Sequence, residues 1–275
     1  MISVVTITLN NLDGLRKTAA SVEAQTCADF EWIVIDGGSA DGTVEFVRSL
    51  SRPPTYFISE KDGGIYDAMN KGVARATGKY VICLNAGDAF HDADVLASVV
   101  KCGLTADVVY GDWYRVYRYH RRFYPAPREL PPFYFFMPKG TLCHQAMFVR
   151  TQLLKDSPFD SAYFVLADLA KWRQFMLEDR SFRYIPQAIC DFDATEGVST
   201  KLSEKNIRDE ELLRNAFPIG LHRQGVALDK LLERRSGRLP WFVRKLRGGL
   251  KCLEEHGLSY TLRVVRGKLK KLQIQ

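Results

Sequence analysis

Carboxylates and other oxygen ligands recur where the predicted strands of the N-terminal half end. Polar groups follow five successive strands, at Thr8, Asn10, Asp36, Glu60, Asp62, Asp88 and Asp112. Any one of these side chains is better explained as a helix cap or a turn residue. Their repetition is harder to explain in that way. A row of such groups could bind a base and a ribose and hold a hard cation against a diphosphate.

The stretch "YVICLNAGDAF" at residues 80–90 shows this arrangement at one strand. Its apolar run is typical of a strand buried on both faces of a sheet. The strand leads into a small turn that ends in Asp88. Ligands bind at the carboxyl ends of strands in open α/β sheets, although Asn, Gly and Asp are also ordinary turn residues. This segment alone therefore favours a ligand site and a plain turn equally.

Strands and helices alternate through the first 112 residues, which predicts a mainly parallel sheet covered by helices on both faces. The predicted strands are 3–9, 30–36, 55–59, 80–85 and 107–113, and the predicted helices are 13–25, 42–50, 65–77 and 92–103. In 113–143, aromatic and basic residues interleave between five prolines, which predicts a hairpin or a long loop. Further on, we predict strands at 144–150, 182–186 and 188–192, a helix at 166–178, and helices from about 203.

Composition disfavours several classes of protein. Residues 1–200 hold 21 Lys and Arg against 24 Asp and Glu, whereas 234–275 hold 12 basic residues and two acids. The net charge of +7 therefore belongs to the C-terminal end, and a nucleic-acid-binding body is disfavoured. No apolar run approaches the roughly 20 residues of a membrane-spanning helix. The start is predicted as a strand and not a signal peptide, and six scattered cysteines indicate a reducing, cytosolic compartment.

Phosphate-binding loops of two common kinds are missing after the first predicted strand. Neither G-x-G-x-x-G nor G-x-x-x-x-G-K-[ST] occurs there. The sequence therefore argues against a dinucleotide-dependent dehydrogenase and against a P-loop enzyme.

Six ordered blocks carry a family resemblance. They are "TITLNN", "VIDGGSADGT", "SEKDGGIYDAMNKG", "GKYVICLNAGD", "CHQAMFVR" and "VLADLAKW". In this order and spacing they resemble the family 2 glycosyltransferases of GT-A fold, most of all those of bacterial capsule, colanic-acid and O-antigen synthesis. The resemblance covers about residues 1–200. It implies a doubly wound sheet, a nucleotide-sugar bound across the strand ends, a Mg²⁺ or Mn²⁺ ion on its diphosphate, and a carboxylate that deprotonates the acceptor hydroxyl.

The resemblance also implies roles for individual side chains. Asp88 aligns with the last acid of the family's D-x-D-like cluster and is the candidate metal ligand, with Asn85 and Gly87 where other acids are usual. Asp168 aligns with the base. Gly37 replaces an aspartate that contacts the nucleobase in many relatives. Recognition of the base then falls to Asp36, Thr8, Glu60 or Asp62, and the remaining candidate donor contacts are Asn10, Asn70, Lys71, Asn85 and His144.

Structural explanations stay open for several of these residues. Asp168 lies near the start of a predicted helix, where Asp is a favoured N-cap. His144 could be a packed strand histidine, and Asn70 and Lys71 could lie on a solvated helix face. We favour a base at Asp168 because of its place in the "VLADLAKW" block and because a general base accelerates such a reaction roughly 10²–10⁴-fold.

The C-terminal end places apolar residues at helical spacing beside basic ones. One stripe consists of Leu258, Leu262, Val265, Leu269 and Leu272. Basic amphipathic helices of this kind favour an anionic membrane surface, here through residues 240–275. Packing of the same stripe on the protein or on a second subunit is the alternative, so a homo-oligomer stays open.

The sequence thus predicts a GT-A domain at 1–202, with a nucleotide-sugar half at 1–112 and an acceptor half at 113–202, and a helical, basic extension at 203–275. The predicted function is inverting transfer of one sugar from a nucleotide-sugar to a lipid-linked oligosaccharide, in bacterial surface polysaccharide synthesis at the cytoplasmic face of the membrane. Transfer is predicted to be non-processive because the Q-x-x-R-W element of processive synthases is absent. The alternatives are a non-catalytic nucleotide-sugar-binding or scaffold subunit and a sugar nucleotidyltransferase.

Overall fold

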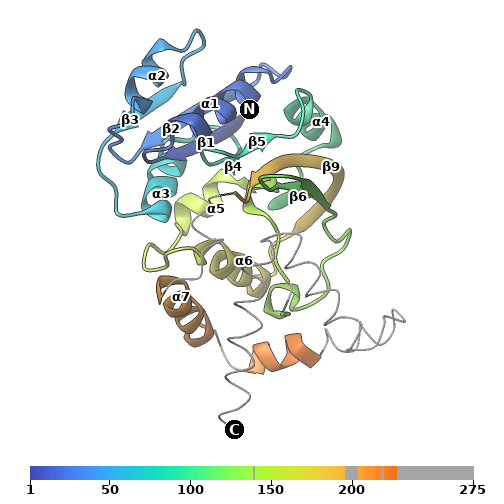
Figure 1. Cartoon of the computed structure of the whole chain (residues 1–275). Coiled ribbons are helices and arrows are strands. Elements are labelled where there is room, and N and C mark those ends of the chain that lie inside the picture. The colour runs from blue at the N-terminus through green and yellow to red at the C-terminus, as the bar shows by residue number, and fades with distance from the viewer. Residues whose placement is uncertain (139, 196–203, 218–219, 228–275) are drawn as a thin grey trace. The chain divides into compact units, whose positions relative to one another are not determined.

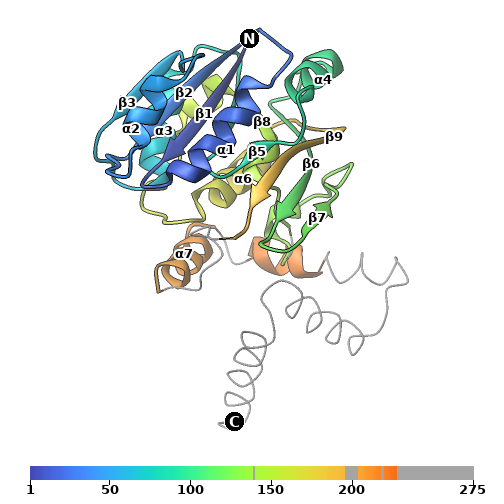
Figure 2. The same cartoon turned by 45° about the horizontal axis from the view of Figure 1, so that its top comes forward.

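A nine-stranded sheet organises the part of the chain that the computed structural model describes, residues 1–138, 140–195, 204–217 and 220–227. Its strands are β1 (Ile2–Thr8), β2 (Phe30–Asp36), β3 (Tyr56–Ser59), β4 (Tyr80–Cys83), β5 (Ala89–Phe90), β6 (Val108–Val116), β7 (Arg121–Tyr124), β8 (Met147–Arg150) and β9 (Phe182–Asp193). They follow the order β3-β2-β1-β4-β8-β6-β9-β5, and β7 pairs with β6 (Figures 1 and 2). The predicted α/β fold class, with helices on both faces of a mostly parallel sheet, is confirmed.

The N-terminal half is built from parallel strands and the helices that connect them. β1 lies between β2 and β4, and β2 also pairs with β3. The helices of this half are α1 (Leu12–Glu23), α2 (Thr43–Ser49), α3 (Ile65–Arg75) and α4 (Val95–Cys102). Successive residues of a strand face opposite sides, so Val4 joins a core with Leu15 of α1 while Val5 joins one with Met69 of α3. The carboxyl ends of these strands meet at one edge of the sheet, called the strand-end edge below.

Antiparallel pairs enter the sheet in its second half. β8 runs antiparallel to both β4 and β6, whereas β9 runs parallel to β6. A short 3₁₀ helix, His144–Ala146, precedes β8, so the strand expected at 144–150 begins only at Met147. The two short strands expected at 182–186 and 188–192 are one strand, β9, whose register against β6 shifts on either side of Asp112. Pro186 lies at this irregularity, because proline has no N–H to give to the ladder.

The aromatic and basic segment after residue 112 contains both a hairpin and irregular chain. β6 and β7 pair across a tight connection, next to β9 in Figures 1 and 2. Rings and guanidinium groups stack along this hairpin: Trp113 lies on Tyr124, and Arg121 lies 4.2 Å from the centre of the Tyr114 ring. The chain then passes through a second 3₁₀ helix, Tyr134–Phe136, whose ring at Phe135 is completely buried.

The helices α5 (Thr151–Asp156), α6 (Ala167–Leu177) and α7 (Glu204–Asn215) follow β8 along the chain, and residues 220–227 are helical as well. α7 belongs to the same compact unit as the sheet, which extends from Met1 to Val226. Asp209 and Leu213 of this helix are buried in that unit. α7 therefore contributes to the interior of this unit, and the domain boundary suggested at 202 stays a prediction. The basic stripe at 240–275 lies outside the described residues.

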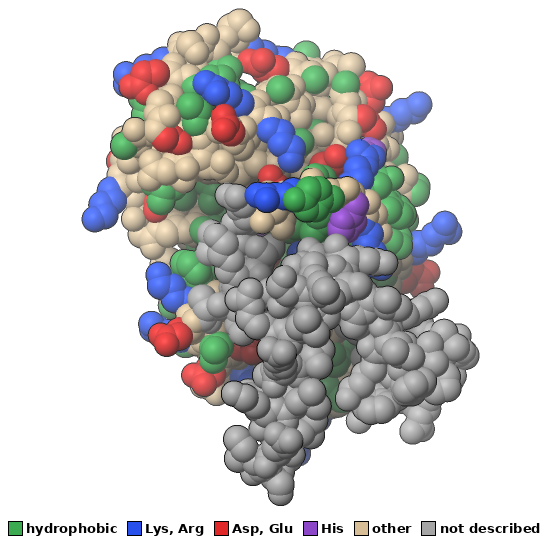
Figure 3. Space-filling view, in the orientation of Figure 1, with side chains coloured by type: hydrophobic (Ala, Val, Ile, Leu, Met, Phe, Trp, Pro, Cys, Tyr) green, Lys and Arg blue, Asp and Glu red, His purple; other side chains and the backbone are tan. Residues whose placement is uncertain are grey.

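The surface of the described residues agrees with the charge count of residues 1–200. On the face shown in Figure 3, acidic and basic side chains are scattered over the N-terminal half and do not gather by sign. Within the described ranges, no helix is long and apolar enough to cross a membrane.

Candidate active site

Asp36 and Asn10 brace the turn after β2. The Asp36 carboxylate is buried and accepts hydrogen bonds from the Ser39 N–H at 3.0 Å and from the hydroxyl groups of Ser39 and Ser59. Asn10, with a φ of 47°, donates its N–H to Ser39 Oγ at 2.7 Å, and its Oδ1 accepts from the Ala40 N–H at 2.9 Å. These bonds fix one wall of the strand-end edge.

Thr8 and Asp62 keep polar atoms available at the same edge. Thr8 Oγ1 is buried, and no hydrogen-bond partner for it is found among the described residues. Asp62 Oδ1 accepts from the Gly64 N–H at 2.9 Å. A Cβ atom at Gly37 would lie only 2.6 Å from Asp62 Oδ2. Asp62 therefore fills the space that a side chain at position 37 would need, which explains why the chain carries glycine there.

Two residues of α3 that the sequence predicts to contact the nucleotide-sugar, Lys71 and Asn70, bind other residues of the protein. The Lys71 ammonium lies 2.9 Å from Glu60 Oε1 and 3.4 Å from Asp67 Oδ2, so three charged groups form one cluster. Asn70 donates its amide N–H to the Phe159 carbonyl at 2.8 Å, and its Oδ1 accepts from the Phe159 N–H at 2.9 Å. Asn70 thus ties α3 to the segment that leads into α6.

Asp112 differs from the other predicted acids because it lies within β6 and not at its end. Its Oδ1 accepts from the Ala126 N–H at 2.8 Å, and its Oδ2 accepts from the Tyr184 hydroxyl at 3.0 Å. The side chain holds the chain after β7 against β9, which is a structural task.

Asp88 lies between β4 and β5, directly before Ala89, in a buried position with 4% of its surface exposed. Its Oδ1 accepts from the Asp193 N–H at 2.8 Å, and its Oδ2 accepts from Gln145 Nε2 at 2.9 Å. Burial raises the pKa of Asp88 to about 6, against the effect of these two hydrogen bonds. The carboxylate therefore lies in a site where a positive charge would stabilise its ionised form.

A divalent cation would find the Asp88 carboxylate here, with that of Asp193 nearby, and not a complete cage. No group of three or more His, Cys, Asp or Glu side chains that could hold a metal occurs in the part of the chain that the structure describes. Each oxygen of a carboxylate has a second lone pair beyond the one used in a single hydrogen bond. Mg²⁺ commonly binds one or two carboxylates together with substrate phosphates. Asp88 therefore fits a cation whose other ligands come from a diphosphate.

Asp168, His144, Tyr66 and Asn85 form a connected cluster at the start of α6. His144 Nδ1 lies 3.1 Å from Asp168 Oδ2, and the Tyr66 hydroxyl donates to Asp168 Oδ1 at 3.1 Å. His144 Nε2 lies 3.4 Å from the Asn85 amide nitrogen. The Asp168 side chain is 19% exposed, so solvent and a substrate can reach it. Burial and the negative charge of Asp168 raise the pKa of Tyr66 well above its ordinary value, so its hydroxyl remains a donor.

The N-terminus of α6 is capped by Asp209 of α7, a residue that the sequence did not single out. Asp209 is 1% exposed, and its carboxylate accepts from the backbone N–H groups of Phe164, Val165 and Leu166 at 2.6–3.0 Å. Asp168 itself is the second residue of α6 and accepts from the Leu169 N–H at 2.8 Å, so it satisfies one first-turn N–H while Asp209 satisfies those before the helix. No local pattern could reveal Asp209, which lies more than 40 residues along the chain from its partners.

The mostly parallel sheet with helices on both faces makes this an α/β protein of GT-A-like fold. Residues 3–154 match the family described as Glycosyl transferase family 2. A PGL/p-HBAD biosynthesis glycosyltransferase of Mycobacterium tuberculosis is 32% identical over 247 residues, which cover 86% of this chain and 90% of that protein. An uncharacterized glycosyltransferase of the same species is 34% identical over 206 residues, 70% of this chain and 75% of that one. The chain belongs to glycosyl transferase family 2, and it is a glycosyltransferase.

Solved structures of low sequence identity share the fold. S. aureus TarS 1–349 in complex with UDP-GlcNAc has a TM-score of 0.61 and 18% identity, over 78% of this chain and 66% of that one. The chain thus spans about two thirds of the TarS fragment. The mannosyltransferase PcManGT from Pyrobaculum calidifontis, in complex with GDP-Man and Mn²⁺, has a TM-score of 0.55 and 17% identity, over 98% of this chain and 86% of that one.

Proposed function

We propose that the protein is an inverting, single-addition glycosyltransferase that moves one sugar from a nucleotide-sugar to a hydroxyl group of a lipid-linked saccharide. The observation that supports this most is the state of Asp168. Its carboxylate is partly exposed and is held by Tyr66 and His144, while Asp209 accepts from the N–H groups that precede α6. A carboxylate fixed in this way is suited to receive a proton from an acceptor hydroxyl.

Asp168 acts as the general base in this proposal. The acceptor oxygen attacks the anomeric carbon, its proton passes to Asp168, and the bond from that carbon to the diphosphate breaks. Direct displacement from the opposite side inverts the configuration of the sugar. Tyr66 and the Leu169 N–H hold Oδ1 of Asp168, and His144 contacts Oδ2, so the direction of the carboxylate is fixed before the substrate arrives.

The strand-end edge binds the donor. Thr8 and Asp62 are the proposed contacts to the base and ribose, because Thr8 Oγ1 has no partner among the described residues and the Asp62 carboxylate can accept bonds beyond the one from the Gly64 N–H. Asp36, Asn10 and Glu60 shape the walls of this edge through the contacts described above. Lys71 and Asn70 support it from α3, and Asn85 and His144 lie on its diphosphate side. The TarS and PcManGT complexes contain UDP-GlcNAc and GDP-Man, which supports a nucleotide-sugar as the donor class.

A divalent cation completes the donor site in this proposal. Asp88 would hold Mg²⁺ or Mn²⁺ against the diphosphate, and the cation would stabilise the negative charge of the departing nucleoside diphosphate. The Mn²⁺ in the PcManGT complex supports this choice of ion. The protein's own contribution is the buried carboxylate of Asp88, kept in place by Asp193 and Gln145.

The acceptor is proposed to be lipid-linked and to belong to a bacterial surface polysaccharide or glycolipid. A relative named for PGL/p-HBAD biosynthesis supports a glycosyltransferase that works on such compounds. Residues 240–275 would bind the inner, anionic face of the cell membrane through their basic amphipathic stripe. The full chain should therefore sediment with anionic liposomes and a chain ending at 236 should not; sedimentation that ignores both truncation and salt would refute this contact.

A donor screen tests the proposed function. The melting temperature of the protein is measured with UDP, GDP, dTDP and CMP and with their sugar derivatives, each with Mg²⁺ and with EDTA. One nucleotide series should raise the melting temperature, and the protein should hydrolyse the matching nucleotide-sugar slowly when no acceptor is present. Binding without any hydrolysis or transfer would favour the non-catalytic subunit, and binding of none of the nucleotides would refute the donor assignment.

A further inference from the structure

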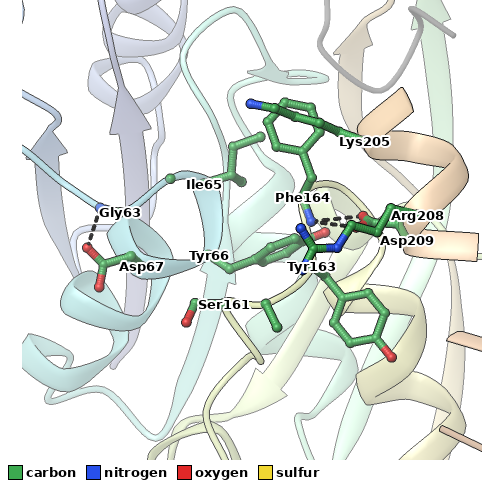
Figure 4. Close-up of a pocket in the computed structure, with 12 residues that line it drawn as sticks. Gly63, Ile65, Tyr66, Asp67, Ser161, Tyr163, Phe164, Lys205, Arg208 and Asp209 are labelled. Atoms are coloured by element: carbon green, nitrogen blue, oxygen red, sulfur yellow. Dashed lines mark hydrogen bonds between the residues drawn. The ribbon is translucent and has the colours of Figure 1, made fainter. Parts of the chain in front are cut away.

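A pocket of about 190 Å³ lies next to the Asp168 cluster, and the proposed donor site does not use it. Three segments far apart in the sequence form it: the start of α3, the loop before α6, and the first turns of α7 (Figure 4). Tyr66 projects from α3 into the space between them, and Phe164, Lys205 and Arg208 face it from the other side. The pocket is open to solvent, so a ligand could enter without unfolding any of these elements.

Two acidic and two basic side chains line this pocket, and they differ in their contacts. Asp209 is occupied by three backbone N–H groups of the loop before α6. Asp67 accepts from the Gly63 N–H at 2.9 Å and pairs with Lys71. Lys205 and Arg208 are exposed, and neither has a carboxylate partner in the described part of the chain; the Lys205 ammonium lies 4.6 Å from the centre of the Phe164 ring. Asp67 and Asp209 thus offset the charge of the pocket but are held by other groups, whereas Lys205 and Arg208 are exposed and form no direct ion pair among the described residues.

The pocket is joined to the proposed base through one side chain. Tyr66 lines the pocket, and its hydroxyl donates to Asp168 Oδ1 at 3.1 Å. A group bound in the pocket would thus be one residue away from the carboxylate that receives the acceptor proton. Lys205 and Arg208 are three positions apart on α7, so they lie on the same face of the helix. A guanidinium fork with a nearby ammonium matches the geometry and the double charge of a phosphate.

We propose that this pocket is the anion subsite of the acceptor, in which Lys205 and Arg208 bind a phosphate-type oxyanion. This inference rests on the proposed function, since it assumes that the acceptor reaches Asp168. Its consequence is positional: a phosphate group held by α7 fixes which hydroxyl of the acceptor faces the base. In this proposal α7 has two roles at the same site. Asp209 positions α6, and Lys205 and Arg208 position the substrate.

Calorimetric titration with inorganic pyrophosphate tests the subsite. The wild type is compared with the double variant Lys205→Gln/Arg208→Gln and with Arg214→Gln, which removes an exposed charge from the last turn of the same helix. The double variant should bind pyrophosphate at least tenfold more weakly, and Arg214→Gln should bind as the wild type does. Wild-type binding should also weaken as salt is added, because the two cations are exposed.

Three results would overturn the proposal. The first is unchanged affinity for pyrophosphate in the double variant. The second is complete loss of this binding in Asp88→Asn with retention in the double variant, which would place the anion at the donor diphosphate site. The third is binding of malonate as strong as that of pyrophosphate, which would show that the pocket accepts a carboxylate as readily as a phosphate. Asp168→Asn leaves both cations in place and should bind pyrophosphate as the wild type does. Sugar transfer by an Asp168→Asn protein would therefore refute the proposed base and leave the evidence for the anion subsite unchanged.

Discussion

Substitution of Asp209 by alanine removes the carboxylate that caps α6 from α7. Three backbone N–H groups, those of Phe164, Val165 and Leu166, then lose their acceptor. A hydrogen bond to a charged group contributes roughly 1.5–3 kcal/mol, but these three residues are half-buried and water can replace part of the loss. We therefore expect the free energy of unfolding to fall by about 3 kcal/mol, near 1 kcal/mol for each N–H group. For a unit of this size, that loss corresponds to a Tm lower by roughly 6–12 °C.

The same substitution should slow sugar transfer, because the released segment leads directly into the first turn of α6. Asp168 would no longer be held against Tyr66 and His144, and a misplacement of about 1 Å can cost roughly 10²-fold in rate. We expect kcat to fall by about tenfold or more. The KM for the donor should stay near the wild-type value, since the strand-end edge is formed by other elements. Asp209→Asn keeps one acceptor oxygen and should be intermediate in both Tm and kcat.

Thermal denaturation followed by circular dichroism and a sugar-transfer assay measure the two effects. Glu210→Ala is the matched control, because Glu210 is an exposed acid on the same helix. It should leave Tm and kcat unchanged. An Asp209→Ala protein with the wild-type Tm would refute the capping role. A protein with a lower Tm that keeps the wild-type kcat at temperatures below its unfolding transition would refute the link from the cap to Asp168.

Three further substitutions test other parts of the structure. Tyr66→Phe removes the hydroxyl that holds Asp168 Oδ1, so kcat should fall about three- to tenfold at unchanged donor affinity; an unchanged kcat would show that the contact is dispensable. Gly72→Ala would place a Cβ atom 2.3 Å from Val5 Cγ1 in the core. Chemical denaturation should show that the free energy of unfolding falls by roughly 1–3 kcal/mol. Gly220→Ala, with open space around it, is the control and should be neutral. Asp88 has a folded-state pKa of about 6, raised from 3.8 by burial. Its folded form therefore binds more protons between about pH 4 and 6, and the free energy of unfolding should fall by about 3 kcal/mol as pH rises through that window. Denaturation of the wild type and of Asp88→Asn should show this slope only in the wild type; parallel profiles would contradict it.

The alternating pattern of the N-terminal half could be read from the sequence because each element is locally determined. β2 occupies 30–36 as predicted, since its apolar run is continuous and bounded by turns. The strand-end polar groups were likewise predictable, because parallel strands deliver their carboxyl ends to one edge. Asp36 and Asn70 nevertheless bind their own protein neighbours, and a one-dimensional pattern cannot distinguish that use from ligand binding.

The second half depended on contacts between residues far apart, so less of it could be predicted. The pairing of β8 between β4 and β6 and the merging of two predicted strands into β9 follow from the sheet as a whole. Asp209 is the most informative residue that the sequence did not reveal. Its four hydrogen bonds join α7 to the loop before α6, and a carboxylate on a polar helix carries no local sign of such a role.

Sugar transfer by Asp168→Asn tests the central claim most directly. Asparagine keeps the shape of the side chain and an oxygen that can accept from Tyr66, but it cannot receive the proton of the acceptor. Turnover should fall by roughly 10²-fold or more. The melting temperature and the affinity for the donor should stay unchanged, since Asp209 caps α6 and the strand-end edge is untouched. Near-normal turnover in a correctly folded Asp168→Asn protein would contradict the assignment of Asp168 as the base.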